Sequence, residues 1–175
     1  LERGSPQQEC AVRRHATMDC GGGCVAAAAI VATTVRLLGQ DVEVYTDNAL
    51  GVAGRPWPAQ EAAALAIRRL APPPERCSTI VELGSGCGAL AIALARELGH
   101  RRRVVATDLP EVLPLLQRNC RAASLKLEAC AGDDSWSGML DCSALPWGSL
   151  SQARAILAQD ACVGSAGDNG RGGAG

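Results

Sequence analysis

The stretch IVELGSGCGALAIALARELG, residues 80–99, constrains the fold of this chain more than any other. An apolar run is followed by three glycines spaced two residues apart, and a helix-like pattern begins directly after them. Leu90, Leu94 and Leu98 recur every four residues, and Gly99 stands where a helix commonly ends. The pattern predicts a buried strand at 77–83, a glycine turn, and a helix at 89–98.

A second strand and a second helix are expected in RVVATDL (103–109) and PEVLPLLQRNCRAA (110–123). This helix should begin late, because Pro114 is tolerated only near a first turn. Strand, helix, strand and helix at this spacing predict a parallel βαβ unit with a right-handed crossover. We expect a third strand near 139–145, whereas QARAILAQDACV (152–163) fits a helix or a strand equally well.

The residues before this unit are expected to form a hairpin at 35–45 around Gly39-Gln40-Asp41, and a helix at 58–70. Pro58 suits the first turn of that helix. Its predicted apolar face consists of Ala62, Leu65, Ala66 and Leu70.

The two ends of the chain lack such patterns. Residues 1–23 are polar and end in glycines, and residues 164–175 are rich in Gly. We expect the N-terminal segment 1–34 and the tail 164–175 to be poorly ordered. The folded domain is therefore predicted to span residues 35–163.

Composition argues against several classes of function. A net charge of −1 over 175 residues gives no general attraction to nucleic acid or to an anionic membrane, so neither is expected as a partner. The apolar run at 24–35 is too short to span a bilayer. Nine cysteines without regular spacing are typical of reduced, buried thiols in a cytoplasmic protein. His15, Cys20 and Cys24 match no standard zinc spacing, and no metal site is predicted.

The glycine turn predicts a ligand site at the N-terminus of a helix. Glycines leave the backbone N–H groups bare, so that a ligand can approach closely. A dinucleotide would need G-x-G-x-x-G/A, which Gly84, Gly86 and Ala89 satisfy loosely. Such a match is a weak signal when it stands alone.

Two acidic residues refine this prediction. Glu82, at the end of the first strand, would repel a pyrophosphate but suits a cation, and Gly88 completes the run E-x-G-x-G-x-G. S-adenosylmethionine carries both an ammonium and a sulfonium group. Asp108 ends the second strand, where an acid can accept the hydroxyl groups of a ribose from either ligand. The residues therefore favour the methyl donor over a dinucleotide.

Four motifs occur in order along the chain: RPWPAQEAAALAIRRL, VELGSGCGALAIALA, VVATDLPEVLPLLQRN and ALPWG. Together they resemble the seven-β-strand protein-lysine methyltransferases outside the SET class, over residues 35–163. The resemblance implies a Rossmann-like, three-layer αβα fold, S-adenosylmethionine as the cofactor, and a lysine side chain of a protein as the substrate. It also implies that only strands one to four of the family's seven are present, in the order 3-2-1-4.

The resemblance assigns roles to the residues at the strand ends. Gly84, Ser85 and Gly86, with Gly88 completing the turn, would line the methionine part of the cofactor, and Glu82 would lie behind them. The remaining cofactor contacts would be Asp108 on the ribose hydroxyls, Leu109 beside the adenine, Trp57 closing over the cofactor, and Trp147 near the adenine. A chain without Phe could instead use both Trp residues as ordinary core rings.

The family usually places D-x-x-Y at the end of its fourth strand. By resemblance, Asp160 would be the catalytic acid that orients the substrate nitrogen, and Val163 stands where the Tyr should be. The alternative is an exposed acid at the end of a short helix.

Three hypotheses for the function remain open. The first is a lysine methyltransferase domain that is incomplete at its C-terminus, and the second is a catalytically inactive remnant that retains cofactor binding. The third is an NAD(P)-dependent oxidoreductase, which the residues support less, because Tyr45 and Lys126 lie far from the glycine turn in the sequence.

Overall fold

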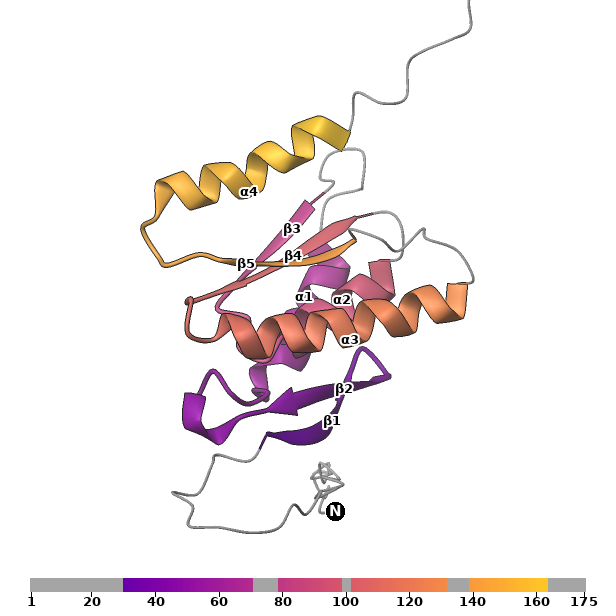
Figure 1. Cartoon of the computed structure of the whole chain (residues 1–175). Helices are drawn as coiled ribbons and strands as arrows, with labels where there is room; N and C mark the ends of the chain where they lie inside the picture. Colours follow the sequence, from indigo (N-terminus) through magenta and orange to yellow (C-terminus); the bar gives the residue numbers. More distant parts are fainter. Residues whose placement is uncertain (1–29, 71–78, 99–101, 132–138, 164–175) are drawn as a thin grey trace, which may run out of the picture.

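The computed structural model describes residues 30–70, 79–98, 102–131 and 139–163. Within these residues a parallel sheet of three strands lies between helices (Figure 1). Helices α2 (Ala89–Leu98) and α3 (Leu113–Ala131) cover one face, and α4 (Leu150–Val163) covers the other. This arrangement is the expected three-layer, Rossmann-like α/β fold, and a β-hairpin packs on the far side of α2 and α3.

The strands of the parallel sheet are β3 (Thr79–Leu83), β4 (Arg103–Asp108) and β5 (Leu140–Ala144), in the order β3-β4-β5. The register pairs Leu83 with Thr107, and Asp108 with Ala144. All three strands therefore end at the same edge of the sheet, where the glycine turn begins. The predicted strand, turn, helix and strand are confirmed, as is the third strand near 139–145.

Helix α2 lies at the centre of the molecule. Every residue from Ala89 to Ala95 is buried, and not only the leucine stripe. The sheet lies on one side of this helix, and α1, α3 and the hairpin surround the rest. Its alternating alanines permit this, because a methyl group lets each neighbour approach closely.

Helix α3 begins at Leu113, directly before Pro114, as the sequence predicted. It continues beyond the expected end at residue 123 to Ala131, through residues that favour helix, such as Leu127 and Glu128.

The hairpin consists of β1 (Val31–Leu37) and β2 (Gln40–Thr46), which pair antiparallel. Leu38 and Gly39 form the turn with positive φ values of 54° and 77°, the geometry that suits a short hairpin loop. The hairpin was predicted, but its first strand begins at Val31 rather than at residue 35. Residues 1–29 and 164–175, for which we predicted disorder, lie outside the described part of the chain.

Helix α1 (Ala59–Leu70) is present as predicted, but its inner face is different. Ala64 is fully buried, and Ala63 and Ile67 pack beside it, whereas Leu65 is 37% exposed and Leu70 is 80% exposed. The helix is apolar on most sides, so periodicity alone did not fix its rotation. Distant polar partners fix it instead: Glu61 Oε2 accepts the Leu38 N–H at 3.2 Å, and Arg68 pairs with Glu97 of α2 at 3.1 Å.

Residues 150–163 form helix α4, so the helix alternative for this segment is confirmed and the fourth strand that the resemblance implied is wrong. The other three strands lie in the expected order 3-2-1. Its inward residues, Ala153 and Ile156, are three apart, which is a helical spacing. Ala153 donates its N–H to the Ser149 carbonyl at 3.1 Å, which starts the helix directly after Gly148. In the described part of the chain, no helix is both long and apolar enough to cross a membrane.

Candidate functional site at the carboxyl edge of the sheet

The glycine turn connects β3 to α2. Gly84, Gly86 and Gly88 have φ values of 71°, 57° and 81°, a region that L side chains rarely adopt. A Cβ on Gly86 would lie 2.7 Å from the Ala53 carbonyl oxygen, and one on Gly88 would lie 2.7 Å from Leu116 Cδ1. A Cβ on Gly84 would meet nothing within 4 Å. The turn is thus closely packed at Gly86 and Gly88, whereas the space beside Gly84 is open.

Ser85 fastens this turn to the sheet. Its N–H donates to the Thr107 carbonyl at 2.9 Å, its hydroxyl accepts the Thr107 N–H at 3.0 Å, and its side chain is 1% exposed. The N–H, the carbonyl and the hydroxyl of Ser85 are thus all engaged inside the fold, and its role in lining the methionine part stays a prediction.

Asp108 holds the turn from the end of β4. Its Oδ2 accepts the Gly86 N–H at 2.6 Å, and its Oδ1 accepts the Leu109 N–H at 2.7 Å. A carboxylate oxygen can accept more than one hydrogen bond, so each oxygen retains acceptor capacity. The structure thus brings Asp108 against the glycine turn, as expected for a group that would hold a ribose beside it.

Glu82 lies beneath the turn in an unusual electrostatic environment. Burial raises its pKa to about 7, and the negative charge of Asp108 adds to this, while hydrogen bonds to Ser85 and to the Ala91 backbone act in the opposite direction. Its Oε2 is buried and has no hydrogen-bond partner among the described residues. No positive side chain within the described residues contributes to the shift. A ligand with a positive charge would supply what this carboxyl lacks.

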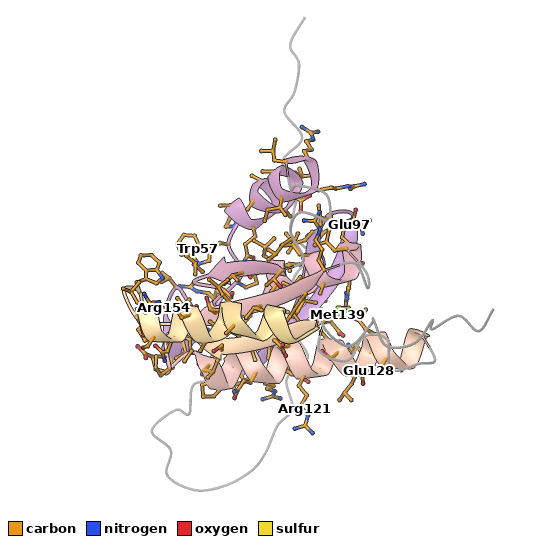
Figure 2. The ribbon with its side chains drawn as sticks, turned by 90° about the horizontal axis from the view of Figure 1, so that it is seen from above. Trp57, Glu97, Arg121, Glu128, Met139 and Arg154 are labelled. Carbon is orange, nitrogen blue, oxygen red and sulfur yellow. The ribbon has the colours of Figure 1, made fainter. Side chains whose placement is uncertain are left out.

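Several large apolar side chains predicted or expected near this edge are exposed. Trp57 is 52% exposed and Trp147 is 81% exposed, so neither is an ordinary core ring. Trp57 is held by its indole N–H, which donates to the Val52 carbonyl at 2.9 Å. Leu83 and Leu109 are also exposed, at the ends of β3 and β4. Figure 2 shows Trp57 on the same side of the view as Arg154 and away from Glu128.

The structure does not bring every predicted residue to this edge. Asp160 belongs to α4 rather than to a strand end, and its side chain lies outside the described part of the structure. Its catalytic role therefore stays a prediction. In the described ranges, no group of three or more His, Cys, Asp or Glu side chains could hold a metal ion.

Sequence reasoning missed Asn119 and residues 47–54 of the loop that leads to Trp57. Asn119 is buried on α3 and bonds to both the hairpin and the turn, and the loop touches the turn at Gly86. The only signal for Asn119 was a polar residue on an apolar helix face. Residues 47–54 carried no such signal, because the residues that they contact are distant in the sequence.

The buried thiols beside the turn are free. Cys87 and Cys120 are buried, and Cys142 is half-buried. Burial raises the pKa of the Cys87 thiol to about 11, so this cysteine stays protonated at neutral pH.

Comparison with known proteins identifies the family of this chain. A family model described as lysine methyltransferase matches residues 37–157, well over half of the chain. The match includes the hairpin's second strand, the glycine turn, Asp108 and most of α4. No curated protein matches the chain. The chain belongs to the lysine methyltransferase family.

Proposed function

We propose that the carboxyl edge of the sheet binds S-adenosylmethionine, and that the domain directs its methyl group to a lysine side chain of a protein substrate. The observation that carries the proposal is the unpartnered Oε2 of Glu82 beneath an open glycine turn. Membership of the lysine methyltransferase family, whose members generally use this cofactor, supports the same reading.

The residues present fit the cofactor. The positive charge of its methionine part would compensate the Glu82 carboxylate, and the open side of Gly84 leaves room for the chain that carries this charge. The spare lone pairs of Asp108 suit the two hydroxyls of a ribose. Leu109 and Trp147 would contact the adenine, and Trp57 would close the opening.

The bound cofactor supplies an electrophilic methyl group on a sulfonium. The protein's own contribution is mainly geometric, because in-line transfer needs the acceptor nitrogen held in one orientation. Asp108 and the turn would hold the ribose end of the donor, and the Glu82 carboxylate would compensate its positive charge. Asp160 is proposed to orient a neutral lysine amine, although its side chain is not described.

The two other hypotheses make different predictions. A dinucleotide would place a pyrophosphate against the turn, where the Glu82 and Asp108 carboxylates lie close enough to influence each other. An inactive remnant would bind the cofactor but transfer no methyl group. Binding and transfer must therefore be measured separately.

The first test is calorimetric titration of the chain with S-adenosylhomocysteine, with NADH as the competing ligand. Asp108→Ala should weaken binding about tenfold or more, because it removes charged acceptors from the ribose. Asp141→Ala is the matched control, since Asp141 pairs with Arg103 at 2.8 Å on a neighbouring strand and has no predicted ligand role. Equal loss in both variants, or binding of NADH instead, would contradict the proposal.

Transfer is tested with S-adenosylmethionine labelled on its methyl group and a mixture of cellular proteins. Labelled lysine that appears with the wild type but not with Asp108→Ala would support an active enzyme. Cofactor binding without labelled lysine would support the inactive alternative.

A further inference from the structure

The side chain of Asn119 joins two parts of the molecule that are far apart in the sequence. It is 2% exposed in the middle of α3. Its Oδ1 accepts the Tyr45 N–H at 2.8 Å, and its Nδ2 donates to the Tyr45 carbonyl at 2.9 Å and to the Cys87 carbonyl at 2.8 Å. One rigid amide group thus holds the end of β2 and the glycine turn at a fixed spacing.

Tyr45 is the base of the loop that carries Trp57. Two residues beyond Tyr45, the Asp47 N–H donates to the Gly54 carbonyl at 3.0 Å and closes the loop. A Cβ on Gly54 would lie 1.7 Å from the Asp47 carbonyl oxygen, so the loop can close this tightly only on a glycine. The indole of Trp57 then bonds back to Val52 within the same loop. The position of Tyr45 therefore determines where Trp57 stands.

The loop and the turn also touch directly. The backbone of Ala53 lies so close to Gly86 that a Cβ there would be 2.7 Å from its carbonyl oxygen. This contact limits how near the two segments come but does not hold them together. The hydrogen bonds of Asn119 to Tyr45 and to Cys87 supply the attraction.

We propose that Asn119 is a positioning residue of the cofactor site, which fixes the loop bearing Trp57 against the glycine turn. The inference rests on the proposed function. Asn119 contacts no ligand itself; its partners are the backbones of the two segments that would enclose the cofactor.

The principal test is Asn119→Ala, assayed for S-adenosylhomocysteine affinity and for urea stability. We expect at least a tenfold weaker affinity. Val42→Ala is the matched control for stability, because Val42 is fully buried in the hairpin core and has no ligand role. Arg118→Met is the matched control for position, since Arg118 stacks 3.8 Å from the centre of the Tyr45 ring and does not reach the turn. If the loss of affinity is proportional to the loss of stability in all three variants, the inference is overturned.

Asn119→Asp adds a readout that a purely structural residue would not give. At neutral pH its carboxylate would face the carbonyls of Tyr45 and Cys87 without a donor, and protonation would restore one donor. The affinity of Asn119→Asp for S-adenosylhomocysteine, divided by that of the wild type, should therefore rise as the pH falls from about 8 to about 5.5. The same ratio for Asn119→Ala should not change with pH. A flat ratio for both variants contradicts the proposal.

Hydrogen exchange of the ligand-free chain tests the coupling independently. Asn119→Ala should increase exchange in both 45–57 and 84–88, whereas Arg118→Met should increase it only in the hairpin. A wild-type chain that does not bind S-adenosylhomocysteine overturns the proposed function and the cofactor role of Asn119 together. A wild-type chain that binds, with undiminished affinity in Asn119→Ala, overturns the role of Asn119 alone.

Discussion

Glu82 is the residue whose surroundings differ most from those of an ordinary surface acid. It is mostly buried, it lies near a second carboxylate, and one of its oxygens lacks a partner among the described residues. A raised pKa in the folded state means that folding takes up a proton at this residue over an intermediate range of pH. Both the stability and the ligand affinity of the domain should therefore depend on pH through this one side chain.

The stability contribution of Glu82 should decrease as the pH rises from about 4.5 to about 7, because its pKa is raised from 4.5 to about 7 on folding. The loss amounts to about 3 kcal/mol at most, at about 1.4 kcal/mol for each pKa unit. Glu82→Gln should be more stable than the wild type at pH 8, with a difference that vanishes near pH 4. Urea denaturation across this range measures the difference, and parallel curves for the two proteins would contradict the assigned pKa.

Binding of a cationic ligand should remove a proton from Glu82, since the positive charge favours the carboxylate. Calorimetry of S-adenosylmethionine at pH 6.5 in two buffers of different ionisation enthalpy should reveal release of part of a proton. Glu82→Gln should abolish this release. The same release in both proteins would mean that another group titrates.

At the scale of single elements, the glycines of the turn differ in their surroundings. Gly86 and Gly88 are closely packed, whereas Gly84 has open space beside it. Gly84 and Gly39 share a positive φ, 71° and 77°, and a Cβ on either meets no atom within 4 Å. Alanine at either position should therefore cost a similar amount, about 1–2 kcal/mol, for the left-handed backbone alone. Only Gly84 lies where the ligand is proposed to bind.

Gly84→Ala should therefore lose affinity for S-adenosylhomocysteine by more than tenfold, whereas Gly39→Ala should lose stability only. Thermal unfolding and calorimetric titration of both variants provide the comparison. Retained affinity in Gly84→Ala would place the ligand elsewhere on this edge.

The sequence predicted those elements whose signals are local. The glycine turn, α2 and the strands on either side follow from spacing and from residues that tolerate few other conformations, and the hairpin follows from Gly39. The rotation of α1 did not follow, because it depends on the bond between Glu61 and Leu38. Asn119 was missed for the same reason, since its hairpin partner lies 74 positions away in the chain.

At the scale of the whole molecule, the sheet separates two apolar clusters of unequal size. The larger cluster contains α2, α3 and the hairpin, and the smaller one consists of Val105, Leu145 and Ile156, with Val81 and Ala153 at its border. Among the side chains of α4 that the structure describes, those of residues 150–158, Ile156 alone is buried. Leu150 and Leu157 are exposed.

Ile156→Ala should loosen α4 while leaving the rest of the domain folded, at a cost of about 2–4 kcal/mol. Leu116→Ala, in the larger cluster, should instead lower the stability of the whole domain by a similar amount. Hydrogen exchange distinguishes the two variants: protection should fall only in 150–163 for the first and everywhere for the second. A uniform loss in both would show that α4 unfolds together with the core.

The burial of α2 on every side has a consequence for how this protein can change through mutation. Ala89, Ala91, Ala93 and Ala95 are almost completely inaccessible, and each faces a neighbouring layer across little more than a methyl group. Larger side chains at these four positions would separate the layers, so a saturation library should accept little beyond glycine, serine or cysteine there. A sheet, a helix and a hairpin packed this closely leave little room for large rings, which agrees with a chain that contains no phenylalanine. The alanines of α2 should therefore be among the positions where substitution is least tolerated, although none of them carries a functional group.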